Sequence, residues 1–416
     1  MGSFMRCPYS PLLSKSMISA SLAFALLLLV PQDPVASAPV TAVPIEAPST
    51  DPLFKAIDGT LKKAAEDGTV VGHSALVFQD GEVLYYGQFG DRDRKKALPM
   101  RRDSIFRIYS MTKPITSVAA MQLVEAGKLK LDEPVATYLP EFADMKVLRK
   151  KGKLVKARRP MTVRDLMRHT SGLTYGFFGT TPVDQMYKEQ GVLVTDTSLK
   201  GLVEKLAKMP LQSHPKLRFH YSVSTDVLAR VVEVASGEEF SAYLKKHIFD
   251  PLGMHDTFFT VPKDKLERLV EMYVPTKEGF VPAPARQSYH FINDSGFHSG
   301  GGGLCSTIDD YLQFCRVLIQ DGSHAGHRIL KPESLAQMFT NQLEGVRYSA
   351  NWFQFGLGFY IEPKLGDYSW AGTAGTSFWV NPERKLAILY MAQINPWGER
   401  AVGDKLRQMT YEALKE

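Results

Sequence analysis

Residues 106–114 decide the fold, and they read Phe106-Arg107-Ile108-Tyr109-Ser110-Met111-Thr112-Lys113-Pro114. Ser110 and Lys113 stand three positions apart at the start of an apolar helical pattern that ends at Gly127, so both side chains lie on one face of the helix. A serine hydroxyl becomes a nucleophile when a neighbouring base accepts its proton. The free N–H groups at a helix start also favour the negative charge that develops in acyl transfer. Ser-x-x-Lys also occurs at ordinary capped helices. The motif alone therefore does not show whether Ser110 is a nucleophile or a helix cap, and other segments of the chain are needed to distinguish the two roles.

Strand patterns lie at the two ends of the 416-residue chain, at residues 73–78, 83–89, 377–380 and 386–392. An Asp80-Gly81 turn joins the first pair, and helical patterns are predicted at 53–66 and 400–414. Helices dominate the middle of the chain, where Thr162 with Asp165 forms a capping box and Ser224 is expected to cap a second helix. This order of strand and helix patterns along the chain predicts an α+β fold, with an antiparallel sheet built from the N- and C-terminal segments and a helical domain inserted between them.

We therefore expect one hydrolase domain over residues 53–416. Its sheet-containing lobe should comprise residues 53–128 and 290–416, and the mainly helical insert residues 129–289. Sites often form where two such lobes meet.

Four further segments share one resemblance with the nucleophile segment. They are Leu129-Lys130-Leu131-Asp132, the run from Thr162 to Gly172, Tyr221-Ser222-Val223-Ser224, and Trp370-Ala371-Gly372-Thr373-Ala374-Gly375-Thr376. Together these motifs resemble the class C β-lactamases and their related esterases, in the order of that family and over nearly the whole chain from residue 53. The resemblance implies a β-lactamase/penicillin-binding-protein-like fold, an α/β sandwich with a helical domain.

The resemblance also assigns roles to individual residues. It implies that Ser110, Lys113 and Tyr221 are catalytic, and that the backbone N–H groups of Ser110 and Thr373 hold the oxyanion. A lysine cation near Tyr221 would favour its phenolate, which could then exchange a proton with Ser110. The substrate should contact Val223, Trp370 and Gly372. His169, inside a matching segment, stands at a position that is structural in this family.

Two departures from the family pattern bear on the substrate. Val223 stands where class C β-lactamases carry an Asn that binds the antibiotic amide, and Trp370 replaces the Lys that holds the substrate carboxylate. Losing a polar donor and a cation weakens β-lactam recognition, and the substitutions look like those of the family VIII carboxylesterases. We therefore expect a serine carboxylesterase that cleaves short-to-medium acyl esters. The alternatives are a β-lactamase, a D-amino-acid peptidase, acyl transfer to an alcohol, or a catalytically silent penicillin-binding module.

Other kinds of site find no support in the sequence. The chain contains neither the Gly-x-Ser-x-Gly elbow of α/β-hydrolases nor a His-Glu-x-x-His motif, so we expect no metal and no cofactor. Ser299-Gly300-Gly301-Gly302-Gly303 lacks the Lys-Ser/Thr of a phosphate loop and is interpreted as a tight loop near the site. Cys305 and Cys315 should be buried and unpaired.

A basic stretch accounts for the net charge of +6. Residues 146–159 hold eight Lys and Arg and no acid, with Gly152 between two short apolar pairs. This is typical of a solvated hairpin, and since no aromatic residues interleave the charges, nucleic acid is not expected as a partner. The expected partner is a small-molecule ester; the sequence does not set the oligomeric state.

The N-terminus has the layout of a secretory signal peptide. Arg6 and Lys15 precede an apolar run over residues 17–30, and Ala36-Ser37-Ala38 offers small residues for cleavage. We expect a signal peptide at 1–38, a Pro-rich linker at 39–52, and a secreted or periplasmic protein without a membrane span after cleavage. An uncleaved N-terminal anchor is the alternative.

Overall fold

The computed structural model describes residues 52–193, 198–347, 353–396 and 401–414. The expected signal peptide and the expected linker up to residue 51 lie outside these residues. No helix in the described ranges is both long and apolar enough to cross a bilayer.

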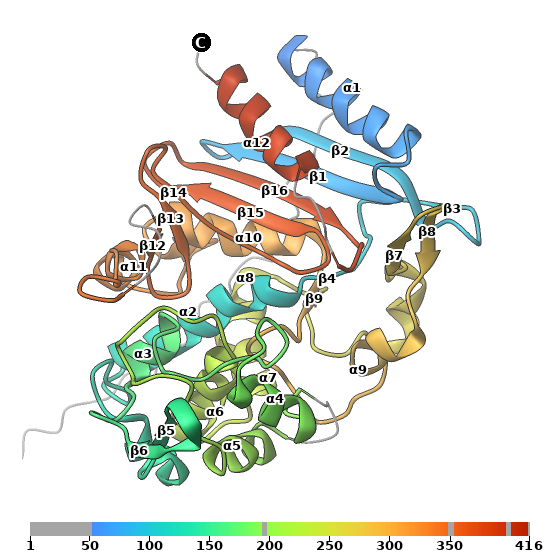
Figure 1. Ribbon diagram of the computed structural model, residues 1–416. Coiled ribbons are helices and arrows are strands. Elements are labelled where there is room, and N and C mark those ends of the chain that lie inside the picture. The colour runs from blue at the N-terminus through green and yellow to red at the C-terminus, as the bar shows by residue number, and fades with distance from the viewer. Residues whose placement is uncertain (1–51, 194–197, 348–352, 397–400, 415–416) are drawn as a thin grey trace, which may run out of the picture. The chain divides into compact units, whose positions relative to one another are not determined.

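An eight-stranded antiparallel sheet is the centre of the structure, with the strand order β12-β13-β14-β15-β16-β1-β2-β3 (Figure 1). In that order the strands are Gln354–Phe355, Tyr360–Glu362, Asp367–Ala371, Thr376–Asn381, Leu386–Ala392, Gly72–Gln79, Glu82–Asp93 and Leu98–Pro99. The two ends of the chain meet where β1 pairs with β16, in a register that sets Leu76 opposite Leu389. The expected α+β architecture, with a sheet built from both ends of the chain, is therefore confirmed.

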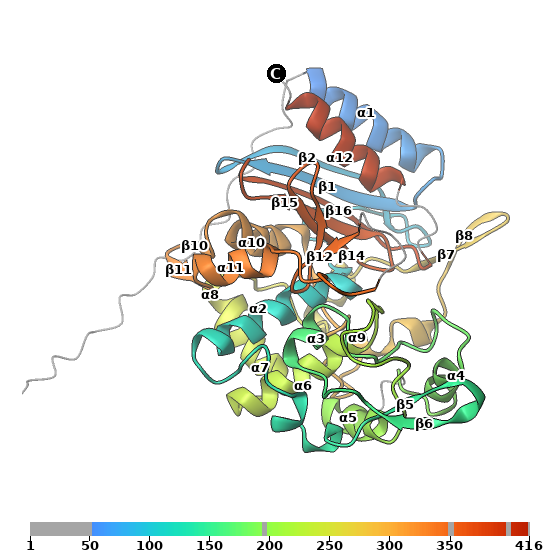
Figure 2. The ribbon, with the colours of Figure 1, turned by 60° about the vertical axis from the view of Figure 1, so that its left-hand side comes forward.

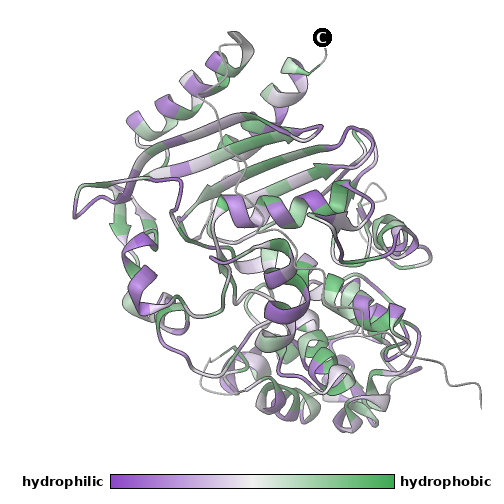
Figure 3. Cartoon of the chain, turned by 180° about the vertical axis from the view of Figure 1, so that it is seen from behind, coloured by the Kyte–Doolittle hydropathy of each residue, from purple (hydrophilic) through white to green (hydrophobic). Residues whose placement is uncertain are grey.

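Helices cover both faces of this sheet. Figures 1 and 2 show α1 (Pro52–Glu66) and α12 (Ala401–Ala413) on one face and α10 (Ile308–Ile319) on the other. Side chains alternate along β1, so that Val77 packs under α1 and α12 while Phe78 joins the larger core on the opposite face. Both faces of the central strands are therefore buried, and the strands are largely apolar in Figure 3.

The remaining helices form the helical lobe and its connections. They are α2 (Thr112–Glu125), α3 (Val163–Met167), α4 (Pro182–Glu189), α5 (Leu199–Ala207), α6 (Ser224–Ser236), α7 (Phe240–Leu244), α8 (Asp250–Leu252), α9 (Tyr289–Ile292) and α11 (Pro332–Phe339). α2, which follows the proposed nucleophile, packs against α6 in this lobe. The site therefore lies where the helical lobe meets the sheet.

Four two-stranded ribbons complete the fold. They pair β4 (Phe106–Arg107) with β9 (Cys305–Ser306), β5 (Lys146–Leu148) with β6 (Leu154–Lys156), β7 (Tyr273–Thr276) with β8 (Gly279–Pro282), and β10 (Ser323–His324) with β11 (His327–Arg328). The β5–β6 ribbon is the hairpin predicted for the basic stretch. Cys305 and Cys315 are buried and free, as expected.

One local prediction differs from the structure. The Thr162–Asp165 capping box is present at α3, but Ser224 does not cap α6: Val223 occupies the cap position, and Ser224 Oγ instead bonds the hydroxyls of Ser171 and Ser222, both at 2.7 Å. The Trp370–Thr376 motif runs from the end of β14 through the turn to the start of β15, and β12 and β13 lie between it and the edge of the sheet.

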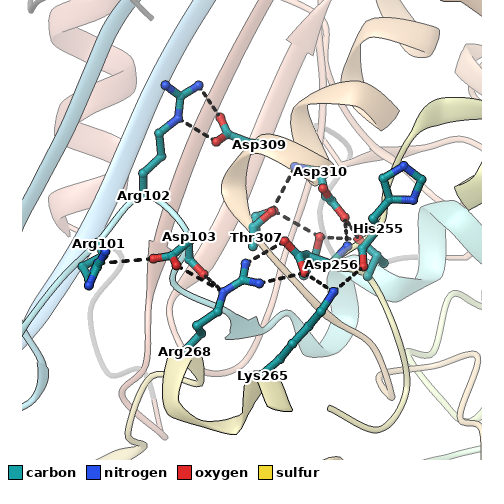
Figure 4. A network of polar contacts seen from close by, with 12 residues as sticks. Arg101, Arg102, Asp103, His255, Asp256, Lys265, Arg268, Thr307, Asp309 and Asp310 are labelled. Atoms are coloured by element: carbon teal, nitrogen blue, oxygen red, sulfur yellow. Dashed lines mark hydrogen bonds and ion pairs between the residues drawn. The ribbon is translucent and has the colours of Figure 1, made fainter. Parts of the chain in front are cut away.

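A polar network anchors the start of α10 (Figure 4). Asp256 pairs with Arg268 at 2.6 Å and with Lys265 at 2.7 Å, while the backbone N–H of Asp256 donates to the Asp310 carboxylate at 2.7 Å. Thr257 Oγ1 donates to the same carboxylate oxygen at 2.9 Å. Burial outweighs these hydrogen bonds and raises the pKa of Asp310 from 3.8 to about 7.

The raised pKa of Asp310 predicts a specific pH dependence of stability. Between pH values near 3.8 and 7 the folded state holds a proton on Asp310 that the unfolded state has released, so this residue lowers the free energy of unfolding as the pH rises. The slope is at most about 1.4 kcal/mol per pH unit. Asp310→Asn removes the titration, so its stability relative to the parent should increase from pH 5 to pH 8. Urea denaturation of both proteins measures this difference, and parallel pH curves would contradict it.

Candidate active site

Ser110 lies in a single helical turn, Tyr109–Met111, between β4 and α2. Tyr109 before it has a φ of +42°, a left-handed conformation that is rare for a bulky residue and that often marks functional turns. Lys113 Nζ donates a hydrogen bond to Ser110 Oγ at 3.2 Å, and the Tyr221 hydroxyl donates to the same oxygen at 2.7 Å. The structure thus brings the three expected catalytic residues together.

Lys113 is almost completely buried, with 1% of its surface exposed. Its Nζ has three hydrogen-bond acceptors: Ser110 Oγ, the Tyr175 hydroxyl at 2.8 Å and the Gly301 carbonyl at 2.6 Å. An ammonium group has three N–H donors, so this environment satisfies all of them and offsets the cost of burying the charge. The carbonyl comes from the glycine loop that was expected near the site, whereas no sequence motif indicated Tyr175.

Asp226 is a second functional residue that sequence reasoning missed. It is buried, and its Oδ1 accepts hydrogen bonds from Ser299 Oγ at 2.5 Å and from the Gly301 N–H at 3.0 Å. A Cβ at Gly301 would approach the other carboxylate oxygen to 2.5 Å, so this position requires glycine. Burial raises the pKa of Asp226, and the Lys113 charge opposes that rise. Asp226 therefore holds in place the loop whose carbonyl binds Lys113.

The expected oxyanion donors lie on the turn that carries Ser110 and on the β14–β15 turn. Gly372, in the β14–β15 turn, lies so close to the residue after β4 that a Cβ there would stand 2.5 Å from the Ile108 carbonyl oxygen and 2.3 Å from Thr376 Oγ1. Thr376 Oγ1 itself donates to the Ile108 carbonyl at 3.3 Å. Within the described part of the chain, the backbone N–H groups of Ser110 and Thr373 donate to no other group, so both are free to bind an oxyanion.

A family model described as Beta-lactamase matches residues 57–411 of this chain. The chain belongs to the β-lactamase family.

Related proteins place the chain more closely within that family. Protein Rv1367c of Mycobacterium tuberculosis is 34% identical over 361 residues, covering 81% of this chain and 89% of that protein. Esterase EstB of Burkholderia gladioli is 32% identical over 365 residues, covering 83% of this chain and 88% of that protein. The solved structure of EstCE1, described as a hydrolase with promiscuous acyltransferase activity, matches with a TM-score of 0.75 and 26% identity, covering 86% of this chain and 98% of that chain. The resemblance is confirmed: this is a β-lactamase-fold serine hydrolase related to the family VIII esterases, and the relatives support the expected class of enzyme, a serine carboxylesterase.

Trp370 and Val223, the two residues at which the chain departs from the class C β-lactamases, have different environments in the structure. Trp370 on β14 is half-buried, and its ring centroid lies 5.4 Å from that of Tyr221, so it stands beside the site as expected. Val223 has no exposed surface and belongs to the hydrophobic core. The expectation that Val223 contacts substrate is therefore corrected, since the start of α6 turns this side chain into the helical lobe.

His169 has a structural environment in this β-lactamase-family site. Its ring is 1% exposed and packs 4.7 Å from the Tyr221 ring. Burial, together with the Lys113 charge, lowers its pKa well below the usual value, so the imidazole is neutral. Among the described hydrogen bonds, none joins it to Ser110, which agrees with a role in packing Tyr221.

A cavity of about 850 Å³ adjoins the site on the sheet side, between α12 and strands β13 to β15. Trp370 and Ala371 line it, but Ser110, Lys113 and Tyr221 do not. The three expected catalytic residues therefore lie outside this cavity, which is a neighbouring feature. Within the described ranges, no three His, Cys, Asp or Glu side chains gather as metal ligands would.

The close packing of Gly372 predicts a large effect of one methyl group. In Gly372→Ala the new Cβ would have to push the β14–β15 turn away from Ile108, and the turn carries the Thr373 N–H. Losing one aligned oxyanion donor lowers kcat by roughly 10²-fold or more. Steady-state kinetics on an activated ester should show this loss in kcat. Gly59→Ala, in α1, serves as a control for glycine replacement, because no packing neighbour among the described residues lies within 4 Å of a new Cβ there. Unchanged kcat in Gly372→Ala would contradict the assignment of this turn.

Proposed function

We propose that this protein hydrolyses small uncharged carboxylic esters, with short-to-medium acyl groups, through an acyl-enzyme on Ser110. One observation carries the proposal: Ser110 Oγ accepts hydrogen bonds from both Lys113 Nζ and the Tyr221 hydroxyl, beside two free backbone N–H groups. A nucleophile, a proton relay and an oxyanion site are the parts that acyl transfer needs.

The contacts of Lys113 favour Tyr221 as the proton acceptor. Lys113 Nζ has three hydrogen-bond acceptors and lies 4.6 Å from the centre of the Tyr221 ring. The Tyr221 oxygen lies 2.7 Å from Ser110 Oγ, nearer than Lys113 Nζ at 3.2 Å, and is therefore well placed to exchange the proton. Tyr175 is unsuited to the same role, since burial and the neighbouring Tyr221 raise its pKa well above the usual value.

The reaction begins from Tyr221 in its deprotonated form. Ser110 Oγ forms a bond to the ester carbonyl carbon as its proton moves to the Tyr221 phenolate oxygen, and the carbonyl oxygen becomes an oxyanion between the N–H groups of Ser110 and Thr373. The carbon–oxygen bond to the alcohol breaks, and Tyr221 returns the proton to the departing alkoxide. Water then attacks the acyl-enzyme, its proton passes to Tyr221, and Ser110 leaves with that proton restored.

The surroundings of the nucleophile support an ester in preference to a β-lactam. Trp370 presents an aromatic ring at the position where the resemblance expects the lysine that holds an antibiotic carboxylate. Two relatives carry names that agree, since EstB is an esterase and EstCE1 is a hydrolase.

Acyl transfer to an alcohol acceptor is a second candidate. The description of EstCE1 includes promiscuous acyltransferase activity, and the same acyl-enzyme can be resolved by an alcohol in place of water. Adding a primary alcohol to the ester assay and quantifying the new ester distinguishes transfer from hydrolysis.

A substrate comparison tests the proposed function. The purified protein is assayed on 4-nitrophenyl acetate, butyrate and octanoate, on a chromogenic cephalosporin and on a D-Ala-D-Ala peptide. We expect the highest kcat/KM on an ester, and no turnover by Ser110→Ala. Faster turnover of the cephalosporin or the peptide would favour the alternatives of the same fold, and failure of a fluorophosphonate to label Ser110 would favour a silent binding module.

We also propose that the protein is exported, on the basis of the charge and apolar pattern of residues 1–38. Expression of the full chain with a C-terminal tag, followed by N-terminal sequencing of the exported protein, should find a mature terminus near residue 39. An uncut N-terminus in the membrane fraction would support the anchor instead.

A further inference from the structure

Two adjacent phenylalanines are exposed in the loop between Thr174 and α4. Phe177 is 55% exposed and Phe178 is 64% exposed, and their ring centroids lie 4.2 Å apart. Neighbouring large apolar side chains that remain in water often mark a surface that binds another apolar group. We call these two rings the phenylalanine pair.

The phenylalanine pair is connected directly to the catalytic group. Phe177 packs 5.1 Å from Tyr175, and Phe178 packs 5.9 Å from Tyr221, measured between ring centroids. Tyr221 in turn donates its hydroxyl hydrogen bond to Ser110 Oγ at 2.7 Å. A single aromatic ring therefore separates the exposed surface from the nucleophile.

The loop that carries the pair is held at both ends by one buried carboxylate. Asp184 Oδ1 accepts a hydrogen bond from Thr174 Oγ1 at 2.6 Å, before the pair, and Asp184 Oδ2 accepts from the Thr181 N–H at 2.9 Å, after it. Asp184 is completely buried, so these contacts are shielded from water. The pair is thus presented on an anchored loop, which lowers the entropy cost of binding a ligand there.

The position of Tyr221 indicates which part of an ester would reach the pair. In the proposed reaction Tyr221 returns the proton to the departing alcohol, so the alcohol oxygen must lie at the Tyr221 hydroxyl. In the same reaction the carbonyl oxygen lies at the Thr373 N–H, in the β14–β15 turn. The Phe178 ring, 5.9 Å from the Tyr221 ring between centroids, is then an apolar surface close to the alcohol substituent.

We propose that Phe177 and Phe178 bind the alcohol portion of the ester, and that they select esters of arylmethyl and other bulky apolar alcohols. The proposal rests on the proposed function and names its substrate class. Aromatic rings gain from stacking and from burial of apolar surface, and neither ring offers a hydrogen-bond donor to a carboxylate.

Two ester series test this selection. In the first, acetate is kept and the alcohol varies from methyl through cyclohexylmethyl and benzyl to 2-naphthylmethyl; in the second, ethanol is kept and the acyl chain varies. We expect the kcat/KM of the unmodified protein to rise with the size of the alcohol. Phe178→Ala should lose about tenfold on 2-naphthylmethyl acetate and less than about twofold on methyl acetate. Phe177→Ala should behave similarly, whereas Leu154→Ala, which truncates a side chain of similar exposure (51%) on β6, should change neither.

Each outcome decides between the two proposals. An equal loss on all acetates would assign the pair a structural role and overturn the inference, as would a loss that follows the acyl series while the alcohol series stays unchanged. In both cases esters are still turned over and the proposed function stands. If the unmodified protein cleaves no ester of either series in a Ser110-dependent way, the proposed function itself fails, and the inference fails with it.

Discussion

Ser110→Ala should lower ester turnover by at least about 10⁴-fold and abolish acyl-enzyme formation. The hydroxyl is the only part of this side chain that alanine lacks, and it is the atom on which the Lys113 and Tyr221 hydrogen bonds converge. No second hydroxyl stands at that point in the described site, so the relay is left without a nucleophile. The oxyanion donors are backbone groups and survive the change, which leaves only the weak rate enhancement that they supply.

Mass spectrometry of the intact protein after a pulse of ester or fluorophosphonate detects the covalent intermediate directly, which rate measurements do not. The unmodified protein should gain the mass of one acyl or phosphonyl group, and Ser110→Ala should gain none. Ser117→Ala is a suitable control, because Ser117 is a buried hydroxyl on the same helix, α2. Labelling of Ser110→Ala at the parent's rate would remove Ser110 from the mechanism.

Lys113→Met should have the second largest effect, lowering kcat by roughly 10²- to 10⁴-fold, the range expected when a group in a proton relay is lost. Methionine has a similar length, so the buried volume stays filled, but the three donors of the ammonium disappear. Ser110 loses one hydrogen bond, and the Tyr221 ring loses the ammonium group 4.6 Å from its centre. We expect the loss in kcat to exceed any change in KM.

The removal of a buried charge also affects stability, so the kinetics of Lys113→Met need a folding measurement beside them. The Gly301 carbonyl and the Tyr175 hydroxyl lose their donor, which costs roughly 1–3 kcal/mol for each group left unpaired. Thermal denaturation should show a folded but destabilised protein. Lys128→Met, an exposed lysine just beyond α2, controls for the loss of a positive charge. A folded Lys113→Met protein with parental kcat would exclude the lysine from the relay.

Local spacing was enough to predict much of this protein. Ser110 and Lys113 share a face because helix geometry brings residues three apart together, whatever surrounds the helix. The strands near residues 73–89 and 377–392 were recognisable from alternating residues and turn signals, and their place at the two ends of the chain predicted a sheet that both ends build.

Contacts between distant segments could not be predicted in the same way. Tyr175 and the Gly301 carbonyl meet Lys113 across 62 and 188 residues, and Asp226 reaches Gly301 across 75. No periodicity encodes such separations, because the chain path through the core sets them. The same limit explains why the prediction that Val223 contacts substrate was wrong. The direction in which a side chain points at the start of a helix depends on how the helix packs, which local spacing does not encode.

The sequence by itself predicted the candidate nucleophile, its lysine, the tyrosine motif and the two-ended sheet, because each depends on spacing within one short segment or on the order of segments along the chain. The tertiary structure alone decided which groups accept hydrogen bonds from Lys113, that the Trp370–Thr376 segment joins two inner strands of the sheet, and that Phe177 and Phe178 stay in water beside Tyr221. Those features depend on burial, which is a property of the whole packed chain and is absent from any single stretch of it.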